Sequence, residues 1–191
     1  NSLEFSSNAT SHALHNGSIA SSSKYISINP ASISIKKNQF EISQFILPAD
    51  IKNSTISFSL IKNTKIFFFK LNSMSYGTLK DDYANIEFKA NDLYFELGQK
   101  SKFKNLFSIG FSIGYIKSSI YKYSSNGIFS NLGLRMNILN ERLSFGASLN
   151  HFGIQLKKFI NTQEYLPTTL RYGMGFRPLY LPVNIYLDFI N

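Results

Sequence analysis

Apolar and polar residues alternate along most of this chain after about residue 33. Between Phe107 and Tyr115 every second residue is apolar, and the intervening residues are only Ser and Gly. A period of two places alternate side chains on opposite faces of a β-strand, and no helical period of useful length appears. The pattern therefore predicts an all-β fold of about nine strands, at 40–46, 55–61, 65–76, 92–99, 107–115, 128–138, 143–150, 170–176 and 183–189.

The first 32 residues differ from the rest of the chain. They are rich in Ser, Asn and Ala, and they show almost no periodicity before Ile26. Beyond them, short polar turns such as Asn63-Thr64 and Asn140-Glu141 separate the expected strands. We therefore divide the chain into an N-terminal segment, residues 1–32, and a strand region, residues 33–191.

Two architectures fit strands with one apolar face. In a soluble sandwich the apolar face is the core, whereas in a transmembrane barrel it meets lipid and the other face lines the lumen. The second face here consists mainly of Gly, Ser and Asn, while charges collect in turns such as Lys80-Asp81-Asp82. Solvent faces of soluble sheets more often carry Lys, Glu and Thr. The second face thus favours an antiparallel transmembrane β-barrel, with a soluble β-sandwich adhesion module as an alternative.

Composition argues against a nucleic-acid-binding protein, a disulfide-bonded protein and a protein with transmembrane helices. The net charge is +9, from 20 Lys and Arg against 11 Asp and Glu, but the basic residues are scattered and form no run of five. A nucleic-acid partner would require a basic stripe, so none is expected. Without Cys the chain has no disulfides or thiolate metal sites, and no stretch approaches the roughly 20 apolar residues of a transmembrane helix.

Few residues suggest chemistry. His12 and His15 lack a nearby carboxylate, and Asp81-Asp82 lacks a calcium-loop pattern. No nucleophile and base form a pair, so we expect no catalytic residue, no metal and no cofactor, and the protein is not expected to be an enzyme. In a barrel, charges on the second face would point into the lumen and need partners. These candidates for lumen ion pairs are Arg135, Arg171, Glu96 and Asp188.

The order of several motifs resembles the PorV/PorQ family of outer-membrane proteins, distant relatives of the FadL transporters. Tyr25 to Ala31 ends in Asn29-Pro30-Ala31, similar to the Asn-Pro-Ala motif of the family, and Asn150 to Lys157 resembles a later signature. Leu166-Pro167 and Leu181-Pro182 fall where the family begins strands. The resemblance runs from about residue 9 to the end. The chain departs from the family in strand number, because members build about fourteen strands. Either further strands follow its C-terminus, the interpretation we favour, or eight or ten strands close the barrel.

The resemblance implies a location in the bacterial outer membrane, in contact with lipid, with residues 1–32 as a plug or hatch in the barrel. It also implies support of type IX protein secretion or surface attachment, through binding of secretion-system or surface-attachment proteins. A FadL-like channel for hydrophobic small molecules is the alternative within the same fold. That alternative would require an apolar lumen, whereas the second face of these strands is rich in Ser, Gly and Asn.

Overall fold

A computed structural model describes residues 19–81, 85–104, 106–140, 142–159 and 166–191. In this part of the chain nine strands form one antiparallel sheet, and the one helical element is the 3-10 turn η2 (Pro30–Ser32). The strands are β1 (Gln39–Leu47), β2 (Ile51–Lys62), β3 (Lys65–Asp81), β4 (Ile86–Phe103), β5 (Phe107–Ile120), β6 (Tyr123–Ile138), β7 (Leu143–Lys157), β8 (Thr169–Phe176) and β9 (Ile185–Ile190).

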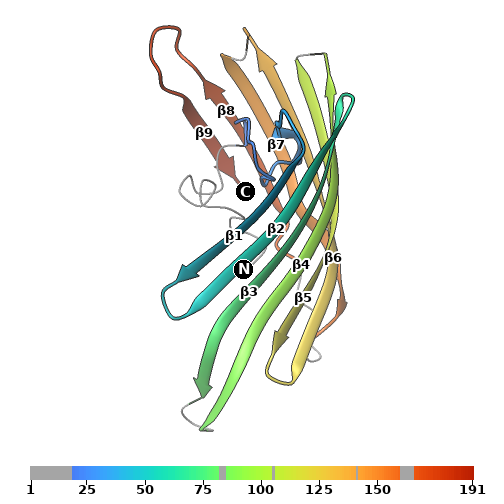
Figure 1. Ribbon diagram of the computed structural model, residues 1–191, viewed down its shortest axis with the longest axis vertical. Helices are drawn as coiled ribbons and strands as arrows, with labels where there is room; N and C mark the ends of the chain where they lie inside the picture. The colour runs from blue at the N-terminus through green and yellow to red at the C-terminus, as the bar shows by residue number, and fades with distance from the viewer. Residues whose placement is uncertain (1–18, 82–84, 105, 141, 160–165) are drawn as a thin grey trace.

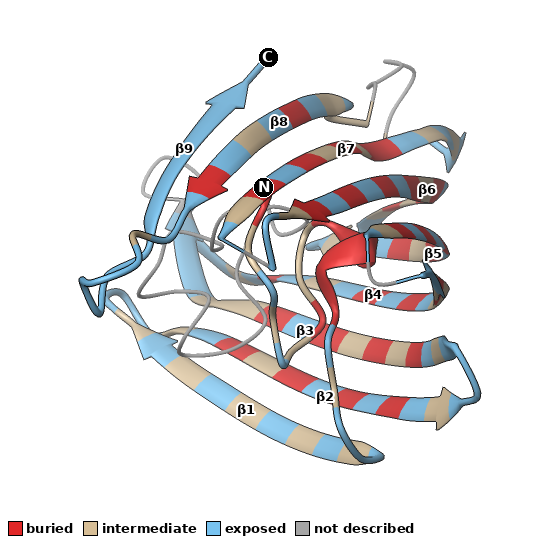
Figure 2. Ribbon diagram, turned by 90° about the horizontal axis from the view of Figure 1, so that it is seen from above, coloured by how far each residue is buried: buried red, intermediate tan, exposed pale blue. Residues whose placement is uncertain are grey.

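Each strand pairs with its neighbours in sequence, so the sheet is an up-and-down meander from β1 to β9. The prediction of nine strands is confirmed. Most strands are longer than expected, because pairing continues into polar residues at their ends: the strand expected at 92–99 is β4, Ile86–Phe103. The sheet curls around an interior, and β1 and β9 stand at the two ends of the strand order (Figures 1 and 2).

The two faces of the sheet differ in burial: the polar face is buried and the apolar face is exposed. On β5, Ser108, Gly110, Ser112 and Gly114 are buried, while Ile109, Phe111 and Ile113 are exposed. Phe111 is 47% exposed and Ser112 is 0% exposed. Bands of buried and exposed residues alternate along β2 to β7 in Figure 2. Small and polar side chains therefore line the concave interior, and large apolar side chains cover the convex outside.

The concave side is occupied by the described part of the N-terminal segment, which in the structure continues to residue 35. Residues 19–35 lie inside the curve of the sheet, and η2 contacts β4, β5 and β6 (Figure 2). Ser23 and Ile33 form an isolated bridge, so the segment folds back on itself. Ile26 and Ile33 pack with Phe68 of β3 in a small apolar cluster. The segment thus supplies part of the apolar core of the interior, and a second cluster, Tyr94, Ile116 and Phe129, comes from β4, β5 and β6.

Candidate functional site

The turn at Asn29-Pro30-Ala31 lies at the centre of the contact between segment and sheet. All three residues are buried. The side-chain oxygen of Asn29 accepts a hydrogen bond from the N–H of Ala31 at 2.9 Å, which caps η2. Its amide nitrogen donates to the carbonyl of Ile19 at 2.9 Å and to that of Leu134 in β6 at 3.1 Å. One Asn side chain therefore closes the turn and joins it to the sheet.

Glycines in the sheet make room for this turn. A Cβ atom on Gly110 of β5 would collide with the backbone of Pro30 and Ala31, and one on Gly133 of β6 would collide with Asn29. Gly146 of β7 faces the carbonyl of Ile19 in the same way. Backbone approach this close is a reason for glycine in a strand interior. The small residues of the second face thus serve the docking of the segment.

Two buried cations of the sheet donate to backbone carbonyls of the segment. Arg135 of β6 donates from Nε to the carbonyl of Ala20 at 2.9 Å. The Nζ atom of Lys100 on β4 donates to the carbonyl of Ile33. Hydrogen bonds from charged donors are stronger than neutral ones. The segment is therefore held mainly by polar contacts, with one apolar cluster beside them.

A second polar group lies further along the concave face, centred on Glu96 of β4. Its Oε1 accepts from the hydroxyl of Ser112 at 2.5 Å and from the amide of Asn131 at 2.9 Å. The Asn131 side-chain oxygen accepts the backbone N–H of His151 on β7 at 2.8 Å. Lys70 of β3 stands opposite Glu96 in the strand register. This network ties β4, β5, β6 and β7 together.

His151 marks an irregularity that the sequence pattern missed. Its backbone has a φ of 55°, and the register between β6 and β7 shifts between Ser130 and Leu132. The bulge turns the His151 side chain inward, where it is buried and meets the Phe129 ring at 5.6 Å. Positive φ is uncommon outside Gly, and although His adopts it more often than most residues, the residue type alone does not locate the bulge.

The residues singled out from the sequence are placed as follows. Arg135, Arg171 and Glu96 are buried on the concave face, whereas Asp188 on β9 is exposed and accepts from the N–H of Ile19 at 3.4 Å. Arg171 of β8 lies opposite Ser148 of β7. Arg135 and Asp188 both hydrogen-bond to the backbone of the segment, at Ala20 and Ile19 respectively. His12, His15 and Asp82 lie outside the described residues.

The described ranges contain no group of three or more His, Asp or Glu side chains that could hold a metal ion. No helix in the same ranges is long and apolar enough to cross a membrane. What the site offers chemically is a polar, tightly packed contact between a wall and an inner segment.

The glycine contacts predict that the segment can be released selectively. Gly110→Ala combined with Gly133→Ala should expel the Asn29–Ala31 turn, because overpacking of this kind costs about 1–3 kcal/mol. Trypsin should then cut more rapidly after Lys24, which is exposed within the segment. Gly114→Ala is the control, because its Cβ would meet Phe129 and not the segment. Equal cleavage of both variants would contradict the docking role.

The Glu96 network predicts a large effect of an isosteric change. Asn131→Asp removes the donor to Glu96 and places a second carboxylate beside it, so the free energy of unfolding should fall by about 2–4 kcal/mol. Asn91→Asp is the control, since Asn91 lies on β4 with Glu96 and is exposed. Urea titrations should show little change for the control. A loss of similar size in both variants would argue against the network.

No protein-family model matches the chain, and no curated protein matches it significantly. The PorV/PorQ likeness therefore rests on the sequence motifs quoted above.

Proposed function

We propose that this protein is an outer-membrane β-barrel protein in which the sheet forms lipid-facing wall and the N-terminal segment fills the lumen. As the PorV/PorQ resemblance implies, such a protein supports type IX secretion or surface attachment by binding partner proteins. The observation that carries the proposal is the inverted sheet, with its polar face buried and its apolar face exposed. Transmembrane barrels have this distribution of side chains.

The apolar outside has the dimensions expected of a membrane band. On β5 the uninterrupted alternation runs from Phe107 to Tyr115, nine residues, and charge returns on the convex side at Lys117. A transmembrane strand needs about 9–11 residues. Tyr115 stacks on Phe95 of β4 at 5.6 Å next to that boundary, and aromatic residues typically gather at the edges of the apolar band. The same band continues on β6 through Leu132, Leu134 and Met136.

The interior supports a filled lumen over a channel for hydrophobic molecules. Its buried residues are largely Asn, Ser, Thr and Gly, with charged residues among them. The segment contacts β4, β5 and β6 on this face through Asn29 and η2. An adhesion sandwich would need a second sheet over the apolar face, and the described strands all belong to one sheet.

Detergent extraction and heat-dependent gel migration test the proposal directly. The protein should remain in the outer-membrane fraction until detergent is added, and the unheated sample should migrate differently on a gel from the boiled one. A closed barrel resists the detergent of the gel until heating. A protein that is fully soluble and monodisperse without detergent would contradict membrane insertion. Capture of secretion components by a tagged protein, absent from a control barrel, tests the partner-binding role separately.

A charged substitution on the convex face distinguishes a lipid environment from an aqueous one. Phe111→Lys should lower the free energy of unfolding in lipid vesicles by about 2–4 kcal/mol if the position lies near the middle of the bilayer. Phe111→Leu keeps the side chain apolar and should cost much less. In water, a lysine at a site that is 47% exposed would be tolerated. Equal stability of the two variants in vesicles would contradict a lipid-facing position.

A further inference from the structure

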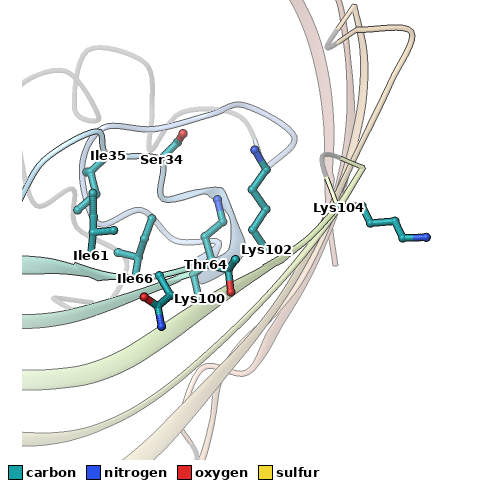
Figure 3. A pocket seen from close by; sticks show the side chains of 9 residues that line it. Ser34, Ile35, Ile61, Thr64, Ile66, Lys100, Lys102 and Lys104 are labelled. Carbon is teal, nitrogen blue, oxygen red and sulfur yellow. The ribbon is translucent and has the colours of Figure 1, made fainter.

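A pocket lies at one end of the sheet, between the N-terminal segment and the first strands. Its volume is about 340 Å³. The segment contributes Ser34 and Ile35, and the turn between β2 and β3 contributes Asn63 and Thr64. The other lining residues are Ile61, Ile66, Lys100, Lys102 and Lys104 (Figure 3). The pocket lies beyond the Asn29–Ala31 contact, and three of its lining residues, Lys100, Ile35 and Ile66, also contact the docked segment or its apolar cluster.

The charges around this pocket are of one sign. The pocket lining contains Lys100, Lys102 and Lys104 and neither Asp nor Glu, and four further lysines, Lys36, Lys37, Lys62 and Lys65, lie one or two positions along the chain from lining residues. We call these seven residues the basic rim. Lys62 and Lys65 even stand directly opposite each other in the β2–β3 register. Like charges in that position destabilise a sheet, so this end of the sheet favours an anion nearby.

Polar and apolar residues occupy different parts of the pocket lining. Figure 3 shows Lys100 and Lys102 extending toward the segment that carries Ser34, while Lys104 points away from the pocket. Ile35 and Ile66 pack against the apolar cluster of Ile26, Ile33 and Phe68, and so form an apolar side. A ligand suited to both sides has an anionic head and an apolar stem. Among anionic heads, a phosphomonoester carries nearly two charges and three strong acceptor oxygens, which suit the charged donors Lys100 and Lys102.

We propose that this pocket binds a phosphomonoester group, with the adjoining apolar stem of the ligand against the isoleucine side. The group can belong to a lipid headgroup or to free phosphate, since both present the same oxygens to Lys102. Buried Lys100 adds charge to the pocket while it holds the Ile33 carbonyl. The proposal does not require membrane insertion, because the pocket is built entirely within this chain.

Calorimetric titration of the full-length protein tests the pocket. The probes are short-chain dihexanoyl phosphatidic acid, inorganic phosphate and hexanoate, added below their micelle-forming concentrations. The titration runs in nonionic detergent, or in buffer if the protein proves soluble, so that failure of membrane insertion and failure of phosphate binding remain distinguishable. Saturable binding of phosphatidic acid, with hexanoate much weaker, is expected. Phosphate binding as tightly as phosphatidic acid would support the site with free phosphate as its source.

Two lysines on the same strand provide the matched variants. Lys102→Gln should weaken phosphatidic acid binding about tenfold, because a charged hydrogen-bond donor is lost. Lys104→Gln removes the same charge from a side chain that points away (Figure 3), and should change the affinity less than about twofold. Circular dichroism checks that both variants keep the fold. Equal weakening by the two variants, or no saturable binding of either phosphate probe, would overturn the proposal.

Discussion

The exposed apolar face of the sheet constrains everything else in this structure. Large side chains such as Phe111, Leu132 and Leu134 point away from the interior over several adjacent strands. Soluble monomers rarely expose contiguous apolar surface beyond a few hundred Å², on the order of 300–600 Å² for the largest patch. A sheet that presents this face outward has to bury its polar face, and polar groups removed from water require partners. Many polar side chains of the interior are accordingly hydrogen-bonded.

Those hydrogen bonds come from two sources with different physical roles. Near one end, Arg135 and Lys100 hold carbonyls of the N-terminal segment, and Gly110 and Gly133 let its backbone approach. Further along, Glu96 is satisfied by Ser112 and Asn131 from neighbouring strands. The first set binds a separable element, while the second braces the wall itself. The hydrogen bonds of the Glu96 network involve no residue of the segment.

Alternation of residue types was sufficient to predict the strands, because apolar and polar residues alternate along a strand whose two faces meet different surroundings. Boundaries were predicted less well, since pairing at the ends of β4 includes Lys100 and Ser101, whose types do not favour strands. The second-face position of Arg135 followed from the same period, but its bond to Ala20 did not, because the two residues lie 115 positions apart. The His151 bulge shifts the register by one residue without any marker in the sequence.

Accessibility along β5 measures the central claim most directly. The chain contains no Cys, so single cysteines can replace Ile109, Phe111 and Ile113 on the convex side, and Ser108 and Ser112 on the concave side. Spin labels at these sites, in protein refolded into vesicles, should respond to oxygen dissolved in lipid at the three convex positions. The two concave positions should be shielded from it. Convex labels that respond instead to a water-soluble relaxation agent would contradict a lipid-facing wall.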